Sequence, residues 1–198
     1  MDDQTLVPPQ NIYSRFCRGI LQLLGWKLVG ERPPFPKYIL VGAPHTSNLD
    51  FFLFLLVVGG HQVQAKWVGK DTLFRGSLGW LTTRLGGIPV NRRSSNGFVQ
   101  QMVAEFAQRS ELVVLIAPEG TRSRTNSWKT GFYYIAAGAQ APLVLAFLDR
   151  SRKEAGFGPS LTPCGDIEAD FTLIRQFYQD KVGLKPSRQG LIQIKPAA

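Results

Sequence analysis

Five consecutive aliphatic side chains, Leu112-Val113-Val114-Leu115-Ile116, form the sequence feature that most constrains the fold. The run shows no alternation of polar and apolar residues, and it is too short for a buried helix. Such a run is typical of a strand that is covered on both faces, as in the middle of a parallel sheet. Similar runs at 38–43 and 142–148 predict two further buried strands. The chain is therefore expected to form a sheet with both faces covered.

Segments with helical spacing of apolar residues separate these strands. Helices are expected at 51–58, 77–85, 96–109, 131–139 and 166–182, and further strands at 62–68, 88–90, 158–162 and 191–194. Alternating strands and helices are typical of an α/β sheet. A length of 198 residues fits one domain. We predict a single α/β domain whose central sheet is mostly parallel and covered by helices on both faces.

The N-terminal part of the chain has a two-sided pattern. Wound as a helix, residues 12–24 place one set of side chains on an apolar side, Ile12, Phe16, Ile20, Leu23 and Leu24, and another on a polar side, Ser14, Arg15, Arg18 and Gln22. This amphipathic helix fits either the membrane interface or the core of its own domain. A linker with prolines at 33, 34 and 36 follows. The predicted division is an N-terminal helix with linker, 1–36, and a main domain, 37–198.

The chain carries a net charge of +9, from 23 basic and 14 acidic residues, which favours an anionic partner. The basic residues do not gather in one helix with base-reading spacing, so nucleic acid is not expected. The longest apolar run, 51–60, is about half of the ~20 residues that span a bilayer. No secretory signal is recognisable at the N-terminus. We therefore expect a chain that does not cross the membrane.

Neither bound metal nor a nucleotide cofactor is expected. Cys17 and Cys164 are the two cysteines, and neither has the spacing of a metal ligand or of a paired thiol. The sequence also lacks the glycine-rich loops that hold ATP or NAD. Any chemistry is thus expected to come from the side chains of the protein.

A histidine and an aspartate five residues apart follow the first buried strand. If His45 lies in a loop and Ser47 or Asn48 caps the next helix, Asp50 falls in the first helical turn and can approach the imidazole. A carboxylate in that place holds one tautomer, so the other ring nitrogen can accept a proton. The alternative is that His45 ends a strand and Asp50 favours a helix N-terminus.

Two more loops that leave predicted strands carry charged residues. They span 91–93, with two arginines, and 119–123, with Glu119 and Arg122. Ligands of open α/β sheets bind beyond the carboxyl ends of the strands. A histidine base, a carboxylate and guanidinium groups at that edge suggest transfer to a hydroxyl group of a phosphorylated acceptor.

Four short blocks together resemble one known family. In chain order they are His45–Asp50, Gly87–Arg92, Pro118–Ser123 and Ala141–Val144. Their residues and order are similar to the four blocks of the glycerophospholipid acyltransferases, which include the 1-acylglycerol-3-phosphate acyltransferases. The resemblance extends from about residue 38 to about residue 148. Two positions depart from the usual pattern, Pro44 before the histidine and Ala117 before the third block.

The resemblance implies direct acyl transfer without a cofactor. His45 would deprotonate the acceptor hydroxyl, which attacks the thioester of acyl-CoA or acyl carrier protein, and Asp50 would orient His45. Ser47 is then a helix cap and not a nucleophile. Residues that would contact the acceptor are Lys70, Arg92, Glu119, Gly120, Thr121 and Arg122.

The acceptor implied by the resemblance is a lysophospholipid, 1-acylglycerol-3-phosphate before others, giving phosphatidate. The protein would work on the inner face of the cytoplasmic membrane, bound to its anionic surface. One alternative keeps the chemistry and changes the acceptor, for example to a lyso-ornithine lipid. A different class of function is a non-catalytic protein that binds anionic lipid or nucleic acid through its net charge of +9.

Overall fold

The computed structural model of the protein describes residues 11–75, 79–90 and 95–194. Strands and helices alternate along most of this length, as the sequence predicts. In chain order the elements are α1 (Ile12–Leu23), β1 (Lys27–Val29), β2 (Lys37–Ala43), α2 (Asn48–Gly60), β3 (Ala65–Lys70), the 3-10 turn η1 (Asp71–Phe74), α3 (Gly79–Arg84), β4 (Gly87–Val90), α4 (Ser95–Gln108), β5 (Leu112–Ile116), α5 (Gly131–Ala139), β6 (Leu143–Asp149), β7 (Glu154–Leu161), α6 (Ile167–Tyr178) and the 3-10 turn η2 (Pro186–Arg188).

One seven-stranded sheet forms the centre of the molecule, with strand order β1-β7-β6-β2-β5-β3-β4. The β6–β7 pair is antiparallel and the other neighbours are parallel. The prediction of a mostly parallel sheet is confirmed. Pro89 lies in β4, an edge strand, where a missing backbone N–H costs least.

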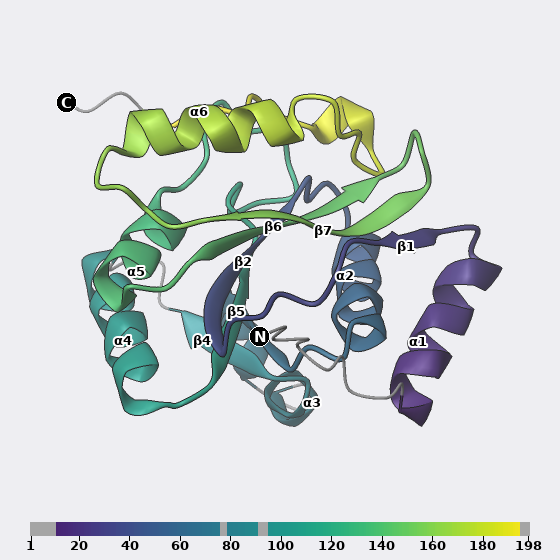
Figure 1. The fold of residues 1–198 in the computed structure, drawn as a ribbon, viewed down its shortest axis with the longest axis horizontal. Helices are drawn as coiled ribbons and strands as arrows, with labels where there is room; N and C mark the ends of the chain where they lie inside the picture. The colour runs from purple at the N-terminus through teal and green to yellow at the C-terminus, as the bar shows by residue number, and fades with distance from the viewer. Residues whose placement is uncertain (1–10, 76–78, 91–94, 195–198) are drawn as a thin grey trace, which may run out of the picture.

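Helices cover both faces of the sheet, also as predicted (Figure 1). On one face, Phe106 of α4, Ile135 of α5 and Ile174 of α6 join the buried cluster under the central strands. On the other face, Leu21 of α1 and Phe54 of α2 belong to a second cluster. Figure 1 shows α4 and α5 on the opposite side of the sheet from α1 and α2. Both layers are held by the burial of aliphatic and aromatic side chains.

The first helix is present, but its apolar side is turned away from the core. Ser14, Cys17 and Leu21 are the buried residues of α1, whereas Ile12 and Leu23 are both 87% exposed. The predicted apolar stripe therefore does not cover the core of its own domain. Within the described ranges, no helix is long and apolar enough to cross a membrane.

Several element boundaries differ from the sequence prediction. The strand expected from residue 62 begins at Ala65, because Gln62 adopts a left-handed conformation (φ 57°) that finishes the turn after α2. The helix expected to reach residue 182 ends at Tyr178. The strand expected at 191–194 is wrong: Ile194 makes an isolated bridge to Trp128. The short β1 was missed, since three residues carry too little pattern to predict a strand.

Candidate active site

The loop after β2 carries His45 into the first turn of α2. Ser47 is the N-cap of α2, and its hydroxyl accepts a hydrogen bond from the N–H of Leu49 at 3.1 Å. Asp50 lies in the first turn and completes a capping box with Ser47. The expected arrangement, with the histidine in the loop and the aspartate just inside the helix, is confirmed.

Asp50 holds this loop mainly through backbone groups. Its Oδ2 accepts hydrogen bonds from the N–H of Thr46 and, at 2.6 Å, from the N–H of Ser47. Its Oδ1 accepts from the Ser47 hydroxyl at 3.2 Å. The Asp50 side chain is fully buried, and charged acceptors make the stronger hydrogen bonds. One carboxylate therefore fixes the two residues that directly follow His45.

The imidazole of His45 lies beside this carboxylate. Its Nδ1 is 3.6 Å from Oδ2 of Asp50, and the His45 side chain is 19% exposed. Burial lowers the pKa of His45, the Asp50 charge raises it, and the Arg122 charge lowers it again, with a net decrease. The ring is therefore neutral at pH 7, the form in which it can accept a proton.

Glu119 is the buried carboxyl group that contacts His45 from the neighbouring strand. β2 and β5 are parallel neighbours with Val41 opposite Ile116, so the loops that follow them lie side by side. Oε1 of Glu119 accepts a hydrogen bond from the N–H of His45 at 2.9 Å. Its Oε2 is buried without a hydrogen-bond partner among the described residues. Burial raises the pKa of Glu119 to about 7.

The rest of the loop after β5 is exposed around the same site. Arg122 donates a hydrogen bond to the side-chain oxygen of Asn48, in the first turn of α2. Gly120 has φ +64°, the positive value that a tight turn requires and that glycine adopts without strain. Thr121 is exposed, and its hydroxyl accepts from the N–H of Ser123 at 3.2 Å.

The remaining predicted residues are less closely connected to His45. Lys70 is exposed and is the last residue of β3, so it lies at the same edge of the sheet as the end of β2. Arg92 lies outside the described residues. Among the described residues, no group of three or more His, Cys, Asp or Glu side chains is arranged to hold a metal ion.

The C-terminal part of the chain also supports the site, which no motif in the sequence indicates. The hydroxyl of Thr46, next to His45, accepts a hydrogen bond from the N–H of Lys185 at 3.0 Å. Gly183 is packed so closely that a Cβ atom there would lie 2.7 Å from Cγ2 of Thr46 and 3.2 Å from Cβ of Pro44. These contacts span about 140 residues of sequence, and no local pattern reports them.

The site thus combines a neutral histidine and a buried carboxylate at the carboxyl edge of an α/β sheet. An arginine is hydrogen-bonded to the same helical turn. A family model described as Acyltransferase matches residues 30–146, more than half of the chain. The chain belongs to the acyltransferase family and is an enzyme of that family. The resemblance of the four blocks is thereby confirmed.

A solved structure has the same fold. The crystal structure of the 1-acyl-sn-glycerophosphate (LPA) acyltransferase PlsC from Thermotoga maritima is similar to this chain with a TM-score of 0.56 and 16% sequence identity. The match covers 84% of this chain and 73% of the other. No curated protein sequence matches the chain. At this identity the structural likeness establishes the fold, and the acceptor must be argued from the site.

Proposed function

We propose that this protein transfers a fatty acyl group from an acyl thioester to the free hydroxyl of a lysophospholipid, with 1-acylglycerol-3-phosphate as acceptor and phosphatidate as product. The observation that carries the proposal is the 3.6 Å approach of His45 Nδ1 to the buried Asp50, with Arg122 bonded to the first turn of the same helix. The base His45, the carboxylate of Asp50 that orients it and the phosphate-binding cation Arg122 then lie around one point.

In the proposed reaction, Nε2 of His45 accepts the proton of the acceptor hydroxyl while the oxygen attacks the thioester carbonyl. The C–S bond then breaks, the ester forms, and the thiolate takes a proton from His45. Asp50 stabilises the imidazolium that exists between these two transfers. The reaction is direct, so Ser47 remains a helix cap, as the hydrogen bond that its hydroxyl accepts from the N–H of Leu49 supports. The acyl donor is acyl-CoA or acyl carrier protein.

Binding of the acceptor is assigned to the cations and to the loop after β5. A planar guanidinium can engage two phosphate oxygens, so Arg122 and Arg92 are proposed phosphate ligands and Lys70 adds a point charge. Glu119, Gly120 and Thr121 line the glycerol part. Oε2 of Glu119 supports this role, because it has no hydrogen-bond partner in the described part of the chain and a glycerol hydroxyl can donate to it.

The proposal includes an anionic membrane surface on the cytoplasmic side, because the acceptor is a lipid. The outward side of α1 supports this location: Ile12, Phe16 and Leu23 are exposed, while Arg15 and Arg18 are the charged residues of the helix. Apolar side chains with neighbouring cations are typical of helices in the interface of anionic membranes.

A panel of lysolipids offered with one acyl-CoA and one acyl carrier protein tests the proposal. The expected product is phosphatidate, and His45→Gln should reduce its formation by about 10³-fold or more. His61→Gln is the matched control, because the chain has two histidines and His61 lies at the far end of α2. If a lyso-ornithine lipid is esterified in preference to 1-acylglycerol-3-phosphate, that lipid is the acceptor. No ester with any acceptor would refute it.

A further inference from the structure

The large apolar side chains that are exposed lie mostly on one of the two helical layers. Among the described residues, α1, α2, η1, α3 and the residues adjoining them carry Ile12, Tyr13, Phe16, Leu23, Leu24, Leu49, Phe52, Leu73, Trp80, Leu81 and Leu85, all more than two-fifths exposed. In the described part of the chain, the layer of α4, α5 and α6 and the C-terminal segment that packs beside α6 carry only Tyr134, Leu173 and Leu191 of this kind. An apolar surface of this extent marks an interaction site.

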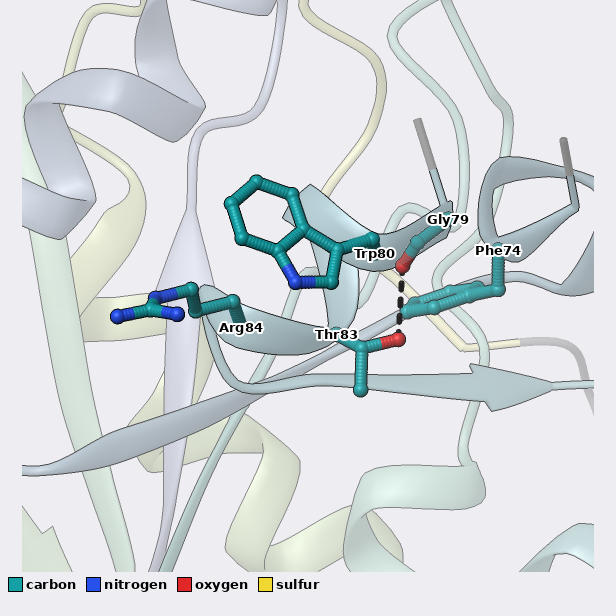
Figure 2. Close-up of a pocket in the computed structure, with 5 residues that line it drawn as sticks. All are labelled: Phe74, Gly79, Trp80, Thr83 and Arg84. Atoms are coloured by element: carbon teal, nitrogen blue, oxygen red, sulfur yellow. Dashed lines mark hydrogen bonds between the residues drawn. The ribbon is translucent and has the colours of Figure 1, made fainter. Parts of the chain in front are cut away.

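One part of this surface lies away from α1. It is formed by Leu73, Trp80, Leu81, Arg84 and Leu85, and we call it the η1–α3 corner. Trp80 is its most exposed member, at 68%. Its indole and the Arg84 side chain line a hollow together with Phe74, Gly79 and Thr83 (Figure 2). The volume of this hollow is about 420 Å³. The Arg84 guanidinium lies 5.5 Å from the centre of the Trp80 ring.

The η1–α3 corner is connected by packed aromatic rings to the helix that begins at the active site. Phe52, in the first turns of α2, contacts Phe51 at a ring distance of 5.7 Å, and Phe51 contacts Trp67 at 4.7 Å. Trp67 then contacts Phe74 at 5.5 Å. The corner therefore packs beside the N-terminal end of α2, where Phe51 directly follows Asp50.

The same surface continues to α1 on the other side of α2. Gly59 of α2 lets α1 approach closely, because a Cβ atom there would lie 2.6 Å from Sγ of Cys17. α2 itself carries the exposed Leu49 and Phe52. A flat partner that contacts α1 thus meets a second apolar group, the η1–α3 corner, on the same layer.

The charges around the η1–α3 corner favour an anionic partner. Asp71 is the acidic residue of η1, and its carboxylate lies 2.9 Å from the guanidinium of Arg75, which balances its charge. Arg84 of α3 then adds a further positive charge. α1 has no acidic residue in its sequence and carries Arg15 and Arg18. Anionic lipid attracts such cations while the bilayer interior accepts the apolar side chains.

We propose that the η1–α3 corner docks on the surface of an anionic bilayer, with Trp80 inserted among the lipids, as a second membrane contact besides α1. A bilayer fits better than a protein partner, because the apolar side chains extend over four elements, α1, α2, η1 and α3. Two contacts on either side of α2, the helix that begins at the active site, would fix the orientation of the molecule on the bilayer. This use of the contact rests on the proposed function, but the docking itself does not.

Tryptophan fluorescence tests the insertion directly. The chain has four tryptophans, all described, and Trp26, Trp67 and Trp128 are each less than a tenth exposed, whereas Trp80 is not. Vesicles of phosphatidylglycerol and phosphatidylethanolamine are expected to shift the emission to shorter wavelength, and brominated lipids to quench it. Trp80→Phe should remove both changes while the protein still sediments with the vesicles. Bound protein whose emission is neither shifted nor quenched would overturn the proposal.

A pair of variants measures the contribution to affinity. Trp80→Gln with Leu81→Gln is expected to weaken vesicle binding by about tenfold or more, since two side chains no longer enter apolar surroundings. Leu173→Gln, on the opposite layer and 55% exposed, should leave binding unchanged. Equal binding by both variants contradicts the proposal. If the corner variant instead loses binding to an acidic acyl carrier protein and keeps its affinity for vesicles, the surface is a protein interface.

Activity measurements separate this proposal from the proposed function. With a short-chain lysolipid and acyl donor dispersed in water, Trp80→Gln with Leu81→Gln should turn over at the wild-type rate, whereas turnover on vesicles falls with the affinity. Insertion of Trp80 by a protein without acyl transfer would refute the function and keep the docking. Acyl transfer on vesicles without insertion of Trp80 would refute the docking and keep the function.

Discussion

At the scale of single residues, Asp50 has two connected tasks. It binds the backbone of Thr46 and Ser47 and it lies beside Nδ1 of His45. Asp50→Asn keeps the shape and removes the charge. We expect a loss of about 10²–10⁴-fold in kcat/KM, because the imidazolium is no longer stabilised, and about 1–3 kcal/mol in the free energy of unfolding.

The pH profile distinguishes these tasks. The negative charge of Asp50 raises the pKa of His45 against the effect of burial. Without that charge, the His45 pKa falls further, so the acid limb of the kcat/KM profile should move to lower pH in Asp50→Asn. An acid limb at the wild-type position, with activity reduced, would show that Asp50 only shapes the loop.

Glu119 is expected to make the protein less stable as the pH rises. Burial raises its pKa from an ordinary value of 4.5 to about 7, so the folded state holds this proton more firmly than the unfolded chain. The associated stability is complete below pH 4.5 and is lost as the pH rises through 7. The loss approaches ~3 kcal/mol as an upper bound.

Glu119→Gln removes this titration and keeps an oxygen that can accept from the N–H of His45. Urea unfolding at pH 5 and pH 8 should show that the stability of the variant relative to the wild type rises with pH. The increase in its free energy of unfolding is up to ~3 kcal/mol at pH 8 and much smaller at pH 5. A difference between the two proteins that does not change with pH would mean that the Glu119 carboxyl group is ionised in the folded state.

The sequence predicted these residues because each lies in a short block with recognisable chemistry. His45, Asp50, Glu119 and Arg122 each belong to a block whose residue types indicate their chemistry. What could not be predicted is which atoms meet. The bond from the N–H of His45 to Glu119 depends on the register of β2 against β5, and register across a sheet is not encoded in either loop alone.

At the scale of elements, two glycines measure how closely α1 packs on α2. At Gly59, in α2, a Cβ atom would lie 2.6 Å from Sγ of Cys17 and 2.9 Å from Cε1 of Tyr13. At Gly19, in α1, it would meet no atom within 4 Å. We expect Gly19→Ala to stabilise the protein by about 0.5–1 kcal/mol, the helical preference of alanine, and Gly59→Ala to destabilise it by about 1–2 kcal/mol, because overpacking outweighs that preference.

Thermal unfolding checks this pair, with opposite changes of about 2–4 °C in Tm for each kcal/mol. If Gly59→Ala raises Tm as Gly19→Ala does, α1 is not held tightly against α2. The sequence predicted both helices but not this contact, since the glycines at 59 and 60 could equally have ended the helix. Element boundaries were missed elsewhere for a similar reason: the turn at Gln62 depends on a left-handed conformation that the pattern of apolar residues does not report.

At the scale of the whole molecule, the prediction of the sheet was the most successful. Fully apolar runs such as 112–116 report burial on both faces, and burial on both faces requires a central position in a covered sheet. The strand order could not be derived in the same way. Neither could the support that the C-terminal segment gives to the site, which lies outside the 30–146 range of the family match.

That support leads to a test of whether the two ends of the domain act together. A Cβ atom at Gly183 would lie 2.7 Å from Thr46 and 3.2 Å from Pro44, and these residues flank His45. Gly183→Ala should therefore displace the loop and reduce kcat/KM by about tenfold or more, since small displacements of a reacting group are costly. Gly131→Ala, where a Cβ atom meets nothing within 4 Å, is the matched control.

The two variants separate displacement of the loop from general loss of stability. Because Thr46 also accepts a hydrogen bond from Lys185, the loop cannot move without disturbing the C-terminal segment, and faster hydrogen exchange at both places should accompany the loss of activity in Gly183→Ala. Exchange that changes only around residue 183, with wild-type kcat/KM, would mean that the segment covers the loop without positioning it. His45 would then be oriented by Asp50 and Glu119 alone, and the segment after α6 would not contribute to the chemistry.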